Sequence, residues 1–232
     1  MTKEQILQEA KALQEEIKSH RLWLHTHAET GFDLTETKPY VKSALTEMGY
    51  AVHECGKAGL VTTVGKPGGK VLLLRADMDA LPIAEEADVD FACKNGRMHA
   101  CGHDLHTTML LGAAKTLCQC RDRFAGTVKL IFEPSEDAMP GGARALVAAG
   151  VMENPHVDAI FGQHVCPSEN DTVGRMQLYK GYFTSAVDLF HITVHGKSGH
   201  GAAPHTARDA IAAQLDAICK GDITDAEMDS TM

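Results

Sequence analysis

Three short apolar runs, separated by stretches with helical spacing, constrain most strongly what this chain can fold into. The runs cover Lys70–Arg75, Gly126–Phe132 and Val157–Phe161. Continuous apolar runs of this length are typical of strands buried on both faces of a sheet. Helical patterns cover residues 105–117 and 142–149. The alternation predicts an α/β fold in which a mostly parallel sheet lies between two layers of helices.

The two ends of the chain show different patterns. Between residues 6 and 17, apolar side chains recur at spacings of three and four, which predicts one amphipathic helix. Residues 188–194 alternate polar and apolar side chains, as a half-exposed antiparallel strand does. We therefore predict a larger α/β domain over residues 1–175. Residues 176–232 are expected to hold the start of a second, α+β domain and a polar tail.

Composition excludes several classes of function. The 232 residues carry a formal net charge of -9 and no long Lys/Arg block, which argues against nucleic acid and anionic membranes as partners. No apolar stretch approaches the roughly 20 residues of a membrane span, and Met1 leads into a charged segment, so we expect a cytoplasmic protein. The seven cysteines lack the spacing of a disulfide framework, whereas thirteen histidines, several beside acidic residues, point toward metal.

Acidic and imidazole side chains follow all three predicted strands. They are Asp77 and Asp79 after the first strand, Glu133, Glu136 and Asp137 after the second, and His164 after the third. In an open, largely parallel sheet, ligands bind in the crevice beyond the carboxyl ends of the strands. We therefore expect these side chains to meet at one rim of the sheet.

Cys101 and His103 join this rim from the start of the helix predicted at 105–117. A thiolate and an imidazole two residues apart can bind one metal ion or two adjacent ions. Of the adjacent pair Glu136 and Asp137, one carboxylate can bind metal while the other takes a proton from water. Each feature alone also has an ordinary interpretation, as hydrogen-bonded histidines or a solvated acidic turn. The metal hypothesis depends on their convergence.

A glycine-rich segment at residues 196–205 holds His200 and His205. Its spacing is not that of a phosphate-binding loop. A histidine on such a loop can donate a hydrogen bond to a developing oxyanion, but a turn with exposed histidines explains the pattern equally well.

Taken together, these segments resemble the M20 metallopeptidase family. Within the family they are most similar to the amidohydrolase branch, which includes hippurate hydrolases, N-acyl-amino-acid amidohydrolases and auxin-conjugate hydrolases. The matching stretches are Leu24–Phe32, Leu74–Ile83, His99–Lys115, Ile131–Asp137 and Gly196–Pro204. They occur in the order that the family shows.

The resemblance implies a role for each candidate residue. The implied metal ligands are Cys101, His103, Asp137 and His164, with Cys101 able to bridge two ions. Glu136 would be the general base and later the proton donor to the leaving amine, and His200 would contact the substrate carbonyl. Asp77, Asp79 and Asp104 would support the ligands without binding metal themselves.

Three departures from the family pattern bear on the site. Asp137 stands where the branch usually has glutamate, which is one methylene longer. Glu133 replaces a usual glutamine and adds negative charge. The family's final histidine ligand follows the lid domain, so we expect it to lie beyond residue 232.

The resemblance implies metal-dependent hydrolysis of the amide bond of N-acyl amino acids, with two divalent ions. Thiolate and imidazole ligands favour Zn²⁺ and carboxylates suit Mn²⁺, and the resemblance favours Mn²⁺. It further implies that residues 176–232 form part of a lid through which two copies pair as a homodimer. Two alternatives stay open: a catalytically inactive relative that binds metal or acts as an interaction module, and a dipeptidase or deacetylase of another M20 branch.

Overall fold

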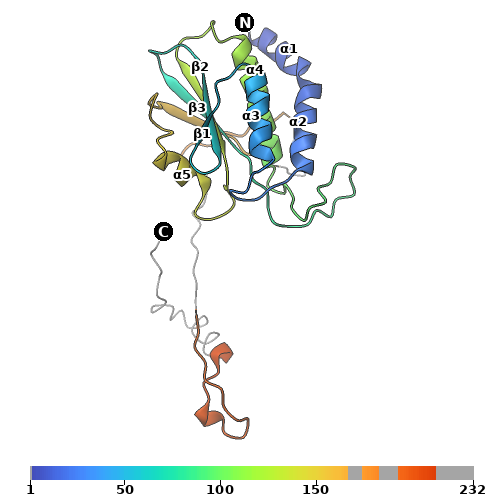
Figure 1. The fold of residues 1–232 in the computed structure, drawn as a ribbon, viewed down its shortest axis with the longest axis vertical. Coiled ribbons are helices and arrows are strands. Elements are labelled where there is room, and N and C mark those ends of the chain that lie inside the picture. Colours follow the sequence, from blue (N-terminus) through green and yellow to red (C-terminus); the bar gives the residue numbers. More distant parts are fainter. Residues whose placement is uncertain (1, 167–173, 183–192, 213–232) are drawn as a thin grey trace. The chain divides into compact units, whose positions relative to one another are not determined.

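The computed structural model describes residues 2–166, 174–182 and 193–212 (Figure 1). The chain divides into two units, Met1–Asn170 and Asp171–Met232. The strand predicted at 188–194 and the polar tail fall wholly or largely outside the described residues. The assignment of residues 1–175 to a catalytic domain and 176–232 to a lid stays a prediction.

The first unit is built around a mixed five-stranded sheet with the order β1-β2-β4-β3-β5. Its strands are β1 His53–Cys55, β2 Gly59–Gly65, β3 Val71–Asp77, β4 Thr127–Glu133 and β5 Ala159–Gly162. Strands β4, β3 and β5 run parallel, as the three apolar runs predict. Strands β1 and β2 form a hairpin, and β2 pairs antiparallel with β4. The expectation of a mostly parallel sheet is therefore corrected to a mixed one.

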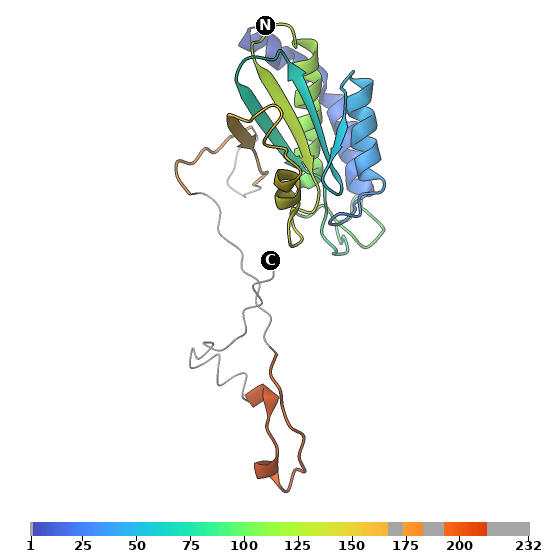
Figure 2. The same cartoon turned by 60° about the vertical axis from the view of Figure 1, so that its left-hand side comes forward.

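The helices of this unit cover both faces of the sheet (Figure 2). They are α1 Lys3–Ala12, α2 Gln14–Thr26, α3 Thr37–Glu47, α4 His103–Gln119 and α5 Gly142–Ala148. One cluster of buried apolar residues packs α2, α3 and α4 on one face of the sheet. A second cluster packs α5 on the opposite face. The helices predicted at 105–117 and 142–149 are confirmed as α4 and α5.

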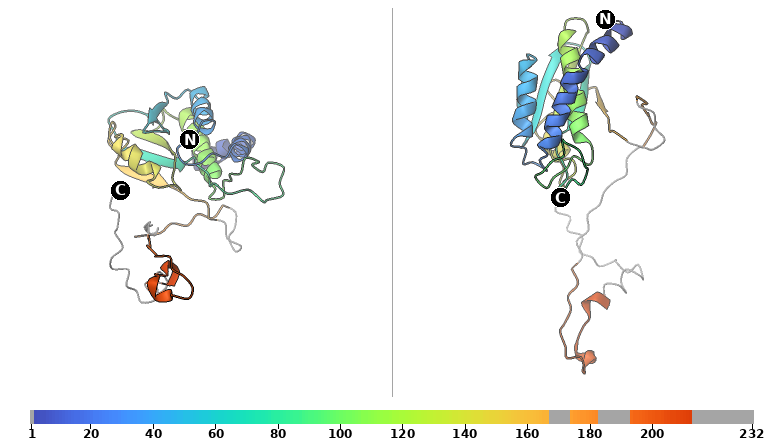
Figure 3. Two further views of the ribbon diagram at one scale, coloured as in Figure 1. Left: turned by 60° about the horizontal axis from the view of Figure 1, so that its bottom comes forward. Right: turned by 90° about the vertical axis from the view of Figure 1, so that its right-hand side faces the viewer.

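The single N-terminal helix predicted over residues 6–17 is wrong in detail, because the chain breaks into α1 and α2 at Leu13. Helix α1 buries no side chain, so Ile6 stays exposed despite its helical spacing. Among the described residues, which begin at residue 2, Leu13 is the first that is buried. From there α2 packs on α4 (Figure 3, right).

Strand β5 does not have the buried environment that its apolar sequence predicts. It lies at the edge of the sheet and pairs only with β3. Ile160 and Phe161 are 57% and 41% exposed, because within the described part of the chain no helix covers them.

No described helix is both long enough and apolar enough to cross a bilayer.

The side chain of Lys129 links β4 to the segment that leads into β5. Lys129 is buried, and its Nζ donates to the backbone oxygens of Val151, Glu153 and Pro155 at 2.7, 2.8 and 2.9 Å. One ammonium group thus provides the hydrogen-bond donor for three carbonyl oxygens. The same contacts offset the large free-energy cost of burying its charge.

We expect Lys129→Met to lower the free energy of unfolding by about 3 kcal/mol, because it leaves three carbonyl oxygens without their donor. Urea denaturation measures this change. Lys115→Met is the matched control: Lys115 pairs with Glu16 where both side chains are about one-third exposed, so its loss should cost less than about 1 kcal/mol. Equal costs for the two variants would contradict this account of Lys129.

Candidate metal centre

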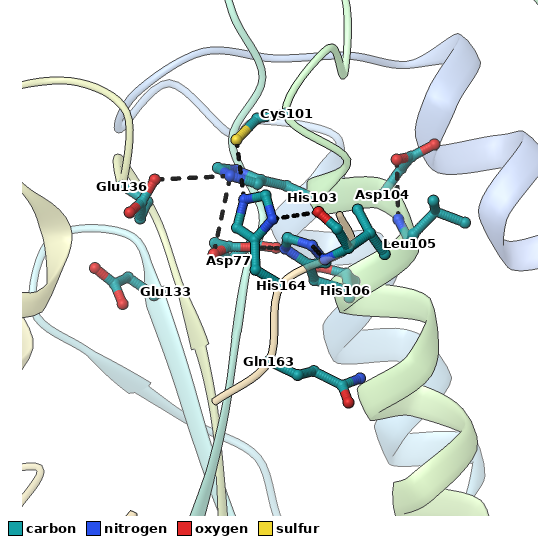
Figure 4. A network of polar contacts seen from close by, with 12 residues as sticks. Asp77, Cys101, His103, Asp104, Leu105, His106, Glu133, Glu136, Gln163 and His164 are labelled. Atoms are coloured by element: carbon teal, nitrogen blue, oxygen red, sulfur yellow. Dashed lines mark hydrogen bonds and ion pairs between the residues drawn. The ribbon is translucent and has the colours of Figure 1, made fainter. Parts of the chain in front are cut away.

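The carboxyl ends of the three parallel strands place polar side chains at one rim of the sheet (Figure 4). Strands β3 and β4 pair in a register that sets Asp77 opposite Glu133. His164 follows the end of β5 by two residues, and α4 begins at His103. The rim predicted from the sequence is therefore present in the structure.

Three overlapping groups of side chains at this rim have the spacing of metal ligands. They are Cys101, His103 and His164; Asp79, His103 and Asp137; and Asp77, His103 and His106. Within each group the potential ligand atoms lie within 4.8 Å of one another. His103 belongs to all three, and the four predicted ligands are all included. The structure thus brings the predicted ligands together, while their binding of metal stays a prediction.

The orientation of His103 is fixed by its hydrogen bond to Asp79. His103 Nδ1 donates to the backbone oxygen of Asp79 at 2.8 Å, since a carbonyl oxygen can only accept. His103 Nε2 is buried and has no hydrogen-bond partner. It lies 3.9 Å from Asp77 Oδ2, 3.7 Å from Glu136 Oε2 and 3.8 Å from Asp137 Oδ2. In the neutral imidazole this nitrogen carries a lone pair, so it faces carboxylate oxygens that are acceptors as well.

A divalent cation fits this arrangement, because imidazole nitrogen and carboxylate oxygen atoms can bind it together. Without a metal, a proton provides the positive charge. Burial disfavours the imidazolium, but the carboxylate of Asp79, whose Oδ1 lies 3.5 Å from His103 Nδ1, and the charges of Asp77 and Asp137 outweigh it and raise the pKa of His103 to about 9.

Cys101 and His164 face each other beside this cluster. Cys101 Sγ lies 3.2 Å from His164 Nε2, and His164 Nδ1 donates to the backbone oxygen of Val165 at 2.6 Å. This leaves His164 Nε2 available as a ligand atom. Burial and the nearby carboxylates of Asp137 and Glu136 raise the pKa of the Cys101 thiol to about 11. Cys101 therefore requires a cation before it can serve as a thiolate ligand.

The acidic pair is held in place by the side chain of Asp79. The backbone amides of Glu136 and Asp137 donate to Asp79 Oδ1 and Oδ2 at 2.9 and 3.2 Å. Burial and the charge of Asp137 raise the pKa of Glu136, and Arg75 acts in the opposite direction. A carboxylate with a raised pKa is suited to take and release a proton near neutral pH.

Arg75 compensates the acidic charge at the strand ends. Its Nε donates to Glu133 Oε2 at 2.7 Å, and its Nη1 donates to Asp77 Oδ2. The negative charge that Glu133 brings is therefore paired. Sequence reasoning did not single out Arg75, although Arg75 and Asp77 are two residues apart on one strand and so share a face.

Asp104 does not point into the ligand cluster. Its Oδ2 accepts hydrogen bonds from His25 Nδ1 at 2.8 Å and pairs with Arg21 Nε at 2.9 Å. Asp104 thus ties the N-terminal end of α4 to α2, next to His103. Its predicted support of the ligands would act through the position of the helix.

His106 is the residue at this rim that sequence reasoning undervalued. Its ring nitrogens contact Asp77 Oδ1 and the backbone amide of Val165. The sequence spacing could have indicated this position, because His106 is three residues after His103 and residues three apart lie on one face of a helix.

His200 lies in the second unit, in a loop closed by paired backbone hydrogen bonds between Lys197 and Arg208. The Ala202 amide donates to His200 Nδ1 at 3.1 Å, which makes His200 Nε2 the protonated nitrogen of the neutral ring. The exposed ring can therefore donate a hydrogen bond. Its predicted contact with a substrate carbonyl stays a prediction.

Imidazole, thiol and carboxylate groups thus gather around His103 Nε2, a buried nitrogen that has no hydrogen-bond partner. Residues 73–231 match the model of peptidase family M20/M25/M40. The chain belongs to this family of metal-dependent amidohydrolases and peptidases.

The relatives of known name agree with this family. The chain is 41% identical to an N-acyl-L-amino acid amidohydrolase of Geobacillus stearothermophilus over 216 residues, which are 91% of this chain and 57% of the relative. It is also 41% identical to a hippurate hydrolase of Campylobacter jejuni, across 86% of this chain and 51% of that one. The chain spans about half the length of the curated relatives it matches.

One solved structure among the relatives is a dinuclear metal-binding peptidase of the M20 family, the YXEP protein of Bacillus subtilis. It is 40% identical, with a TM-score of 0.63 over 68% of this chain and 44% of that chain. A crystal structure from Staphylococcus aureus matches the fold more fully, with a TM-score of 0.76 and 33% identity over 94% of this chain and 58% of that one.

The raised pKa of His103 should make the stability of the metal-free protein depend on pH. Because the folded-state pKa lies above the ordinary value of about 6.5, this stabilisation is fully present below about pH 6.5. It is lost as the pH rises through about 9. We therefore expect the Tm of the metal-free protein to fall across this window. The fall should be smaller in His103→Asn.

A metal ion bound by the predicted ligands would compete with the proton for His103 Nε2, so added metal should act most strongly at the higher pH. We expect Mn²⁺ or Zn²⁺ to raise the Tm more at about pH 8.5 than at about pH 6.5. Scanning calorimetry at both pH values measures the shifts. Equal shifts at the two pH values would contradict competition at His103.

Proposed function

We propose that this chain contributes the catalytic centre of an enzyme that hydrolyses the amide bond of N-acyl amino acids, with hippurate-like substrates and two divalent metal ions. The observation that carries the proposal is the buried His103 Nε2, which faces Asp77, Glu136 and Asp137 without a hydrogen-bond partner. The names of the amidohydrolase and hippurate hydrolase relatives support the substrate class.

The proposed metal ligands are Cys101, His103, Asp137 and His164, and the proposed general base is Glu136. Bound divalent ions would lower the pKa of water and polarise the substrate carbonyl. Glu136 would take the proton of the attacking water and pass it to the leaving amine nitrogen. Its raised pKa and its place 3.7 Å from His103 Nε2 support this role.

The other residues of the site would bind and orient. Asp79 fixes the ring of His103 and the backbone of the acidic pair, so it holds ligand and base in one geometry. In the second unit, His200 would donate from Nε2 to the substrate carbonyl, in line with the tautomer that Ala202 imposes. The further proposal that residues 176–232 belong to a lid through which two copies pair follows from the family resemblance.

The ligand set contains preferences for two metals. The thiol of Cys101 and the imidazoles favour Zn²⁺, whereas the carboxylates at the rim suit Mn²⁺. We propose Mn²⁺, the metal that the resemblance to the amidohydrolase branch favours.

We expect Glu136→Gln to lower the release of free amino acid from hippurate by about 10²–10⁴-fold, because the amide cannot accept the proton. Metal binding should stay close to that of the unaltered protein. Glu153→Gln is the matched control, since Glu153 is an exposed carboxylate paired with His156. Amino acid release is followed by a ninhydrin-type assay with Mn²⁺ or Zn²⁺ present. A metal-loaded, folded protein that is inactive on a panel of N-acyl amino acids would overturn the proposed activity.

The second candidate is an inactive relative that binds metal or acts as an interaction module. It is favoured by the shorter carboxylate of Asp137, which stands where the amidohydrolase branch usually has glutamate. Metal content per chain separates the two, and mass spectrometry under native conditions measures it. We expect two ions per chain for the enzyme. One ion or none would favour the inactive relative.

A further inference from the structure

His106 lies among the candidate ligands, but both of its ring nitrogens are already in use. The carboxylate of Asp77 can only accept, so His106 Nδ1 donates to Asp77 Oδ1 at 2.6 Å. The backbone N–H of Val165 can only donate, and it lies 2.9 Å from His106 Nε2. The two contacts together fix one neutral tautomer of His106.

Val165 extends this chain of hydrogen bonds to a predicted ligand. Its backbone oxygen accepts from His164 Nδ1 at 2.6 Å. His164 Nε2 then points its lone pair toward Cys101 Sγ, 3.2 Å away (Figure 4). Asp77, His106, Val165 and His164 are therefore connected in series, and the series ends at a candidate ligand atom.

The segment that carries His164 has little other support on the sheet side. It leaves β5, an edge strand whose four residues are all exposed. Besides the bond from Val165 to His106, the segment contacts α4 through Gln163 Nε2, which reaches Met109 Sδ at 3.1 Å, and through the His164 ring, whose centroid lies 4.5 Å from that of His106. Just before α4, Val165 packs so closely on Gly102 that a Cβ there would lie 2.5 Å from Val165 Cγ2.

We propose that His106 is a positioning residue. Its hydrogen bond with the Val165 amide, termed the latch, holds the His164 segment on α4 and so keeps His164 Nε2 directed toward Cys101. This inference rests on the proposed metal centre. It assigns His106 no metal, although Asp77, His103 and His106 have ligand spacing, because its lone pair is bound by the Val165 amide. An outer hydrogen bond that orients a ligating histidine typically changes metal affinity about 10–100-fold when it is lost.

Two substitutions of His106 separate its two contacts. In His106→Asn the amide can still donate to Asp77, but the side chain is too short to accept from Val165. In His106→Gln the longer side chain places an oxygen where it can accept from the Val165 amide. Thr108→Val is the matched control, because it removes a buried hydrogen bond of the same helix, from Thr108 Oγ1 to the Asp104 oxygen, without touching the His164 segment.

Two measurements report on the latch. Amide hydrogen exchange at Val165 in the metal-free protein tests the contact itself, and Co²⁺ binding, followed by its thiolate absorption, tests the ligand geometry. We expect His106→Asn to speed Val165 exchange by about 10-fold or more and to weaken Co²⁺ binding by about 10–100-fold. In His106→Gln and Thr108→Val, both quantities should stay within about threefold of the unaltered protein.

The outcomes distinguish the latch from the proposed function. If the unaltered protein binds Co²⁺ and His106→Asn binds it equally well, the latch is overturned and the metal centre stands. Equal weakening in His106→Asn and His106→Gln would overturn the latch in favour of direct ligation, and equal weakening in Thr108→Val would overturn it in favour of general destabilisation. If the unaltered protein binds no Co²⁺, the proposed function and the positioning role both fail, whatever the exchange rate of Val165.

Discussion

The geometry of the whole rim depends on the hydrogen bonds of Asp79. Its backbone oxygen holds His103 Nδ1, and its carboxylate holds the amides of Glu136 and Asp137. Asp79, which follows β3, thus fixes the start of α4 and the turn after β4 relative to each other. Because Asp79 is buried, these bonds lie where water competes weakly, and the positions of imidazole and acidic pair are set before any ligand arrives.

Electrostatics explain why such a cluster can persist in a fold. Carboxylates gathered at one rim repel one another, and the protein offsets this in two ways. Arg75 pairs with Glu133 and Asp77, while His103 faces the remaining acidic oxygens and has a pKa raised to about 9. The arrangement therefore favours a positive charge at His103 Nε2. A metal ion can supply this positive charge and contact several of the surrounding carboxylate and imidazole groups at once, whereas a proton binds to one nitrogen.

The sequence predicted the parts of the fold that repeat a simple pattern. Parallel strands with continuous apolar runs, the helices α4 and α5, and the side chains at the strand ends all follow from local periodicity. The hairpin of β1 and β2 was not predicted, because β1 has only three residues and Thr62 and Thr63 interrupt the apolar residues of β2. The exposure of β5 was not predicted either, because an apolar run does not show which other elements of the fold cover it. At the site, residue types and spacing indicated Cys101, His103 and the acidic pair. The partners of His106 required the structure, because Asp77 and Val165 meet it only after folding.

The candidate ligands differ in how firmly the fold holds them. His103 begins a helix and is fixed by Asp79, and Asp137 is fixed through its own backbone. His164 lies beyond an exposed edge strand, and its ring is oriented through Val165, the residue that His106 binds. Disorder at a ligand reduces metal affinity because binding must then order it. The metal affinity of the proposed centre would therefore depend most on His164, its least supported ligand, and the hydrogen bond between His106 and Val165 lies next to that residue.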